Sequence, residues 1–128
     1  MDGNPIRKAD LLGKVTVINY WFVGCPPCEV ERPALNELVK KYAGRNDVIF
    51  ISFARNSKEE LLPFLRDSPL LCAVVPTEKD FIKKHLGGNG FPSNIIVGKD
   101  GKYFYNSLAS GIGIANILEQ QIEKALRQ

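Results

Sequence analysis

Histidine, tryptophan and methionine each occur only once in this chain of 128 residues, and cysteine occurs only three times. The single histidine is His85, and Cys72 has no second cysteine within a few positions. A closed tetrahedral zinc site takes four cysteine or histidine ligands in paired spacings. The sequence therefore predicts no structural metal site of this kind.

Long apolar runs and basic stripes are also absent. No apolar stretch approaches the ~20 residues that a membrane-spanning helix needs. The net charge is only +3, and the lysines and arginines are scattered without interleaved aromatic residues, which argues against a nucleic-acid partner. A chain of this length with 45% hydrophobic and 24% charged residues is typical of one α/β domain, here expected over residues 1–128.

The most informative motif is Cys25-Pro26-Pro27-Cys28, placed where an apolar run over residues 15–23 meets a helical pattern. Two thiols at this spacing can close on each other within one helical turn. A strand-to-helix junction also directs amide N–H groups and the positive end of the helix dipole at the first sulfur, which favours thiolate over thiol. The favoured chemistry is thiol–disulfide exchange.

The third cysteine, Cys72, lies in an apolar run over residues 70–75. A reactive thiol needs exposure and a setting that stabilises the thiolate. We expect Cys72 to be a small buried thiol that serves packing.

Apolar periodicity predicts an alternation of strands and helices. A β-rich run predicts a central strand over residues 14–21 that is buried on both faces, and helical spacing predicts a helix over 26–42. Further strands are predicted over 48–53, 70–75, 93–97 and 103–105, and further helices over 57–66, 77–86 and 116–126.

Two of these helices have additional local signals. Ser57 followed by Glu60 indicates a capping box at the start of the helix over 57–66. The last helix has one apolar stripe, expected to contain Ile117, Leu118, Ile122 and Leu126.

The element order matches an α/β thioredoxin fold. We expect a central mixed β-sheet flanked by helices, with a parallel βαβ unit followed by an antiparallel hairpin. The strand over 70–75 and the helix over 77–86 form a βα insertion. Composition alone does not separate this fold from other α/β arrangements, and the cysteine motif decides between them.

The chain resembles the TlpA/ResA group of bacterial thioredoxin-like thiol–disulfide oxidoreductases. The resemblance rests on GKVTVINYWFVGCPPC (13–28), ERPALNEL (31–38), GFPSN (90–94) and KDGK (99–102). Residues 1–12 are fewer than the N-terminal hairpin of that group requires. We therefore expect a domain cut from a longer precursor, extracytoplasmic or periplasmic and in its full length membrane-tethered.

The resemblance implies catalytic roles for three residues. Cys25 is expected to be the attacking thiolate and the more exposed thiol, and Cys28 the resolving thiol, one turn further into the helix. Glu31 completes a CxxCxxE pattern and is expected to exchange a proton with the resolving thiol. Asn19 stands where thioredoxins have a buried aspartate, which leaves Glu31 as the proton acceptor.

The resemblance also implies a substrate groove. Pro92 matches the cis-proline that faces the cysteines, and Pro26 and Pro27 separate the two thiols. Gly24 replaces the usual tryptophan and is expected to open the groove, whereas Phe91 replaces a smaller residue and offers an aromatic platform.

The resulting hypothesis is a protein disulfide oxidoreductase of the bacterial cell envelope, with an intermediate to reducing potential. Its expected partners are cysteine-containing protein substrates and an upstream thiol electron donor. No dissociable cofactor is expected, because the Cys25–Cys28 disulfide is itself the redox-active group. One alternative stays open, a Cu(I)-binding or delivery protein that uses the two thiolates and His85. A peroxidase function is not favoured, because peroxidase relatives of the same fold place a threonine three residues before the attacking cysteine, where this chain has Phe22.

Overall fold

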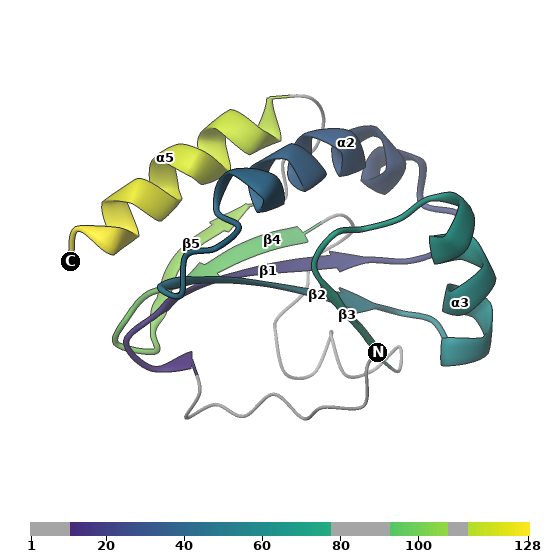
Figure 1. Ribbon diagram of the computed structural model, residues 1–128, viewed down its shortest axis with the longest axis horizontal. Coiled ribbons are helices and arrows are strands. Elements are labelled where there is room, and N and C mark those ends of the chain that lie inside the picture. Colours follow the sequence, from purple (N-terminus) through teal and green to yellow (C-terminus); the bar gives the residue numbers. More distant parts are fainter. Residues whose placement is uncertain (1–10, 78–92, 108–112) are drawn as a thin grey trace.

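In the part of the chain that the structure describes, five strands form one mixed sheet in the order β3-β2-β1-β4-β5 (Figure 1). The computed structural model describes residues 11–77, 93–107 and 113–128. The strands are β1 (Val15–Trp21), β2 (Val48–Ala54), β3 (Ala73–Pro76), β4 (Ser93–Val97) and β5 (Tyr103–Ser107). Strands β1, β2 and β3 run parallel, whereas β4 and β5 pair antiparallel. All seven residues of β1 are buried, which confirms the predicted central strand.

Within the described residues, three helices accompany the sheet, namely α2 (Pro26–Lys41), α3 (Lys58–Asp67) and α5 (Ile114–Leu126). Each lies where a helix was predicted. The capping box of α3 is present, with the Ser57 hydroxyl accepting from the Glu60 N–H and the Glu60 carboxylate accepting from the Ser57 N–H. The helix predicted over 77–86 lies outside the described residues.

Strand β3 begins later than predicted, at Ala73 instead of residue 70. The reason is a contact from α2: the Asn36 side chain donates to the carbonyl of Pro69 at 3.0 Å and accepts from the N–H of Leu71 at 2.9 Å. These bonds occupy the backbone just before β3, and Leu71 is left 47% exposed. Pairing with β2 starts only where Ala73 lies opposite Ile51.

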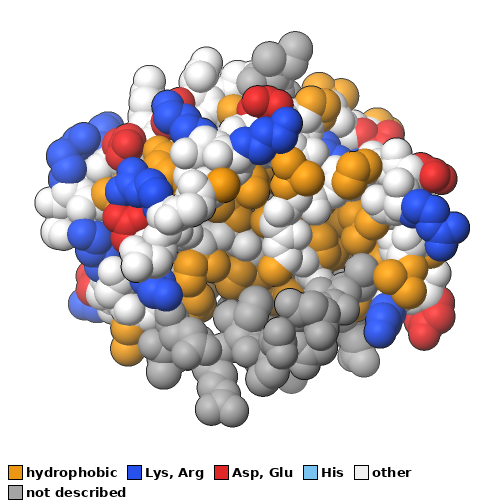
Figure 2. All heavy atoms as spheres, in the orientation of Figure 1, with side chains coloured by type: hydrophobic (Ala, Val, Ile, Leu, Met, Phe, Trp, Pro, Cys, Tyr) orange, Lys and Arg blue, Asp and Glu red, His pale blue; other side chains and the backbone are white. Residues whose placement is uncertain are grey.

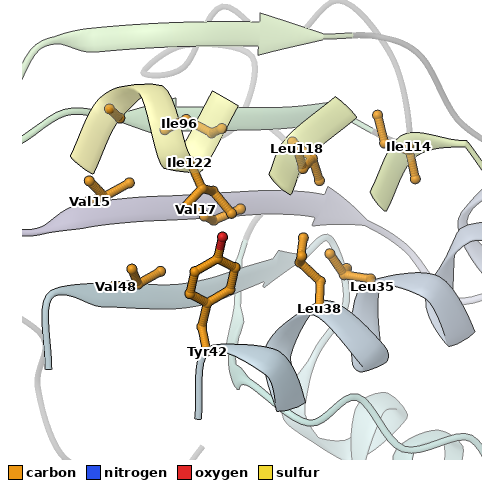
Figure 3. Packing of buried hydrophobic residues seen from close by; sticks show 11 residues of the cluster. Val15, Val17, Leu35, Leu38, Tyr42, Val48, Ile96, Ile114, Leu118 and Ile122 are labelled. Atoms are coloured by element: carbon orange, nitrogen blue, oxygen red, sulfur yellow. The ribbon is translucent and has the colours of Figure 1, made fainter. Parts of the chain in front are cut away.

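The largest hydrophobic cluster lies between the sheet and the helices α2 and α5 (Figure 3). Its buried residues are Val15, Val17, Leu35, Leu38, Tyr42, Val48, Ile96, Ile114, Leu118, Ile122 and Ala125. The predicted stripe of α5 is therefore partly wrong: Leu118 and Ile122 are buried, but Ile117 is 39% exposed. Ile114 and Ala125 complete the buried face instead, because they lie four and three residues from Leu118 and Ile122, on the same side of the helix.

The opposite face of the sheet buries a smaller cluster of Ile18, Tyr20 and Ile95. Side chains alternate between the faces of a strand, so this cluster and the one beneath α2 are formed by alternate residues of β1. In Figure 2, acidic and basic side chains lie intermixed around the edge of the molecule, and hydrophobic side chains gather across its centre. Within the described ranges, no helix combines the length and the apolar character that crossing a membrane would require.

Two neighbouring positions of α5 test this packing. Leu118→Ala should lower the free energy of unfolding by about 2–5 kcal/mol, because it leaves a cavity in the main cluster. Ile117→Ala, one residue away but exposed, should change it by no more than about 0.5 kcal/mol. Urea unfolding of both variants measures the difference, and equal losses would contradict the orientation of α5.

Candidate active site

The two cysteines of the CPPC motif form a disulfide at the junction of β1 and α2. Cys25 is the N-cap residue of α2, and Cys28 lies in its first turn. Their Cα atoms are 5.3 Å apart, within the range that a disulfide spans. The motif thus lies at the strand-to-helix junction that the sequence predicted.

The turn that leads into the disulfide is held from two sides. Gly24 adopts a φ of +91°, a left-handed backbone conformation that residues with a Cβ atom adopt only at an energetic cost. The N–H of Val23 donates to the Asn56 side chain at 2.7 Å, and the Asn56 amide donates in turn to Glu60 at 3.2 Å. The active-site turn is therefore anchored to the start of α3, through an asparagine that the sequence analysis did not single out.

Both sulfurs belong to a buried cluster. Cys25 is 2% exposed and Cys28 is 3% exposed, so the prediction that Cys25 is the more exposed thiol is wrong for the disulfide state. The cause is packing, because the cysteines share a cluster with Trp21 of β1 and Leu61 of α3.

Gly24, Pro26 and Pro27 are exposed around the disulfide. The two prolines occupy the first two positions of α2 and have no N–H. The first backbone N–H after Cys25 is therefore that of Cys28. The next one, that of Glu29, donates to the Cys25 carbonyl at 3.1 Å. The helix terminus offers the Cys25 sulfur fewer donors than the motif's position alone suggested.

Glu31 is a buried carboxyl on α2, 2% exposed and one turn beyond Cys28. Its Oε1 accepts a hydrogen bond from the Asn19 Nδ2 at 3.0 Å, and its Oε2 accepts one from the Asn94 Nδ2 at 3.5 Å. Burial raises the pKa of Glu31 to about 7, although these two bonds and the Arg32 guanidinium act to lower it. A carboxyl with this pKa can gain or lose a proton near neutral pH.

The residue after Glu31 is also buried. The Arg32 guanidinium lies 4.7 Å from the centroid of the Trp21 ring and 5.0 Å from that of Phe64. Its Nη1 donates to the Ser68 hydroxyl at 2.9 Å, and burial lowers the pKa of Arg32. Arg32 therefore joins α2 to α3 behind the disulfide, a role for which the sequence analysis had no signal.

The third cysteine does not join this pair. Cys72 is a free thiol, partly buried just before β3. Burial raises the pKa of Cys72 to about 12, so the thiolate is scarce at neutral pH. This environment fits the expected packing role.

Three residues named from the sequence lie outside the described residues. They are Phe91 and Pro92, predicted for the substrate groove, and His85, predicted for the copper alternative. Within the described part of the chain, no group of three or more His, Cys, Asp or Glu side chains could hold a metal ion.

Comparison with known proteins gives relatives that act on disulfides by name. The chain is similar to the thiol-disulfide oxidoreductase ResA of Bacillus anthracis, with 30% identity over 102 residues, which cover 80% of this chain and 59% of ResA. It is also similar to the thiol:disulfide interchange protein CycY of Rhizobium leguminosarum, with 31% identity over 126 residues, covering 94% of this chain and 65% of CycY. The chain thus spans less than two thirds of the length of these relatives.

Solved structures share the fold. A thiol:disulfide interchange protein of the thioredoxin family from Chlorobium tepidum superposes with a TM-score of 0.79 at 22% identity, covering 98% of this chain and 88% of that one. A thiol-disulfide isomerase from Corynebacterium glutamicum superposes with a TM-score of 0.82 at 18% identity, covering 99% and 90%. Both confirm the predicted α/β fold, with a central mixed sheet flanked by helices.

The family described as thioredoxin-like matches residues 13–103, which include all of β1, α2, β2, α3, β3 and β4. This match includes the CPPC motif and Glu31. The chain therefore belongs to the thioredoxin-like family, and within it the chain is similar to the ResA-type thiol-disulfide oxidoreductases.

Proposed function

We propose that this chain is a thiol–disulfide oxidoreductase that reduces or exchanges disulfides of protein substrates through Cys25 and Cys28. The observation that supports it most is a disulfide at a strand-to-helix junction with a buried carboxyl, Glu31, one turn away. The named relatives point to the same reaction class. No dissociable cofactor takes part in the proposed reaction, because the electrons come from the dithiol itself.

The proposed reaction has two steps. The Cys25 thiolate attacks one sulfur of a substrate disulfide, forms a mixed disulfide with it, and releases the other substrate sulfur as a thiolate. Cys28 then attacks the Cys25 sulfur, which closes the Cys25–Cys28 disulfide and releases the second substrate thiolate. Two electrons pass to the substrate, and a donor dithiol must afterwards reduce the Cys25–Cys28 disulfide.

Glu31 is the proposed proton acceptor for the second step. Cys28 is 3% exposed in the disulfide state, so in the same surroundings the Cys28 thiol of the mixed disulfide has almost no direct path for its proton to bulk water. Glu31 lies three residues further along the same helix, on the same face, and its pKa is about 7. As a carboxylate it can take the Cys28 proton, which leaves Cys28 as the nucleophilic thiolate.

The start of α2 supports a proposal for the direction of exchange. Strong oxidants of this kind have a reduced form stabilised by a favoured thiolate. Here Pro26 and Pro27 remove two backbone donors from the helix terminus, so the Cys25 thiolate gains less stabilisation. We therefore assign the chain to the reducing part of the range.

The proposed substrate surface consists of the exposed Gly24, Pro26 and Pro27, together with Phe91 and Pro92 as the resemblance assigns them. The partners are cysteine-containing protein segments and an upstream thiol donor. The proposed setting is extracytoplasmic, from the similarity to ResA and CycY, with residues 1–128 as a single domain of a longer protein. The relatives do not favour the Cu(I) alternative, since they are named for disulfide chemistry.

Single cysteine variants test the order of attack. Cys25→Ser should abolish turnover of a disulfide-bonded protein substrate, because no attacking thiolate remains. Cys28→Ser should accumulate a mixed disulfide with the substrate, visible as a covalent adduct by mass spectrometry under non-reducing conditions. Cys72→Ser is the matched control and should behave as wild type. Adducts that form through Cys28 in the Cys25→Ser variant, but not through Cys25, would reverse the assigned order.

The role of Glu31 gives a pH profile. In the wild-type protein, the rate at which Cys28 resolves the mixed disulfide should fall as the pH falls through about 7, because Glu31 becomes protonated and cannot accept the Cys28 proton. Glu31→Gln should slow this step on the order of 10²-fold and remove that limb of the profile. Glu29→Gln, an exposed carboxylate of the same helix turn, is the control. A Glu31→Gln profile that keeps the wild-type limb would rule Glu31 out.

A further inference from the structure

Three polar side chains form one row across the middle of the sheet, beneath α2. Ser52 of β2 lies opposite Asn19 of β1, and Asn19 lies opposite Asn94 of β4. All three are buried, and all three point to the face that α2 covers, where Glu31 contacts Asn19 and Asn94. A polar row in a core is costly unless every member has a partner.

The hydrogen bonds of this row run in one direction. The Trp21 indole Nε1–H donates to the Ser52 Oγ, and the Ser52 hydroxyl donates to the Asn19 Oδ1 at 3.5 Å. The Asn19 Nδ2 then donates to the Glu31 Oε1 at 3.0 Å and to the Asn94 Oδ1 at 2.9 Å. The chain ends at Glu31, which also accepts from the Asn94 Nδ2.

The indole sets this direction because it can only donate. Trp21 takes one of the two lone pairs of the Ser52 oxygen, and the Ser52 hydroxyl proton is directed to the amide oxygen of Asn19. The Asn19 NH₂ group is thereby turned toward the Glu31 carboxyl. The reverse orientation would place the Asn19 oxygen against a carboxylate and its NH₂ group against the Ser52 hydroxyl.

The other end of the chain lies beside the disulfide. The Trp21 ring packs in the same buried cluster as Cys25 and Cys28, and the Arg32 guanidinium lies over it. Arg32 is the charged group that acts on Glu31 from α2, whereas β1 and β4 face it with the neutral Asn19 and Asn94. The neutral Ser52 of β2 contacts Asn19. Glu31 is therefore connected to Trp21, which belongs to the cluster around the disulfide, through the neutral side chains of Asn19 and Ser52.

We propose that Ser52 and Asn19 are positioning residues for Glu31: the Trp21–Ser52–Asn19 chain holds the Asn19 amide as a donor to the carboxylate and couples the protonation of Glu31 to the indole N–H. This inference deepens the proposed function, because it assumes that Glu31 serves Cys28. It also predicts that Trp21 senses the state of Glu31 in the absence of any substrate.

The single tryptophan makes the coupling measurable. The Trp21 indole N–H resonance is the only one of its kind, so its chemical shift can be followed by NMR in the oxidised protein as the pH is varied. In the wild type it should shift with a midpoint near that of Glu31, and the shift should be lost in Glu31→Gln. The latter comparison also separates Glu31 from His85, because Glu31→Gln leaves the histidine in place.

Variants of Ser52 test the route. Ser52→Ala should abolish the response of the indole and move the pH limb of Cys28 resolution to higher pH, because Glu31 loses an oriented donor. Ser52→Thr, which keeps a hydroxyl, should restore both. Thr16→Val is the matched control: the Thr16 hydroxyl is buried on the opposite face of β1 and has no partner among the described residues, so its loss should leave the titration unchanged.

Two outcomes would overturn the proposal. One is an indole resonance that does not respond to Glu31 in the wild type. This measurement needs no Ser52 variant, so it also decides the question if Ser52→Ala does not fold. The other is a response that persists in folded Ser52→Ala. Since the titration uses the oxidised protein without substrate, it can succeed even if disulfide exchange is absent, and its failure leaves the cysteine experiments untouched.

Discussion

The burial of the Glu31 carboxyl is the constraint on which the rest of this structure depends. A carboxyl that is removed from water needs hydrogen-bond partners, and here they come from Asn19 of β1 and Asn94 of β4. A slip of one residue in either strand would turn its asparagine to the other face of the sheet. The position of α2, the register of the central strands and the proton chemistry of the site are thus set by the same contacts.

The position of the disulfide depends on contacts that α2 and the turn before it make with other elements, as well as on the helix itself. Asn56 fixes the preceding turn from the start of α3, and Arg32 lies over Trp21 and Phe64 behind the sulfurs. Of the described residues that adjoin Cys25 in the sequence, Gly24 and the two prolines are exposed. In the proposed reaction the two events therefore take place on different sides: the substrate approaches Cys25 from the surface, and the Cys28 proton passes to Glu31 within the core.

Features that depend on local sequence were predictable. The central strand, α2, the capping box of α3 and the position of the CPPC motif follow from periodicity and short-range spacing. The start of β3 was not predictable, because it depends on the distant Asn36, and neither was the burial of Cys25, which depends on packing against α3. Ser52 and Asn94 gave no signal by themselves, since a polar residue in a strand usually indicates an exposed face. Only the strand register shows that they meet Asn19 under α2.

The reduction potential of the Cys25–Cys28 pair is the measurement that decides whether the protein is a reducing thiol–disulfide oxidoreductase. The protein can be equilibrated at pH 7 with glutathione or dithiothreitol redox buffers and its free thiols counted. We expect one free thiol, Cys72, in the oxidised protein and three in the reduced protein, with a midpoint closer to thioredoxin's value of about −270 mV than to the value of about −120 mV typical of a strong oxidant. A midpoint at the oxidising end would contradict the reducing role, and a thiol count that does not change with the buffer would contradict the exchange chemistry itself.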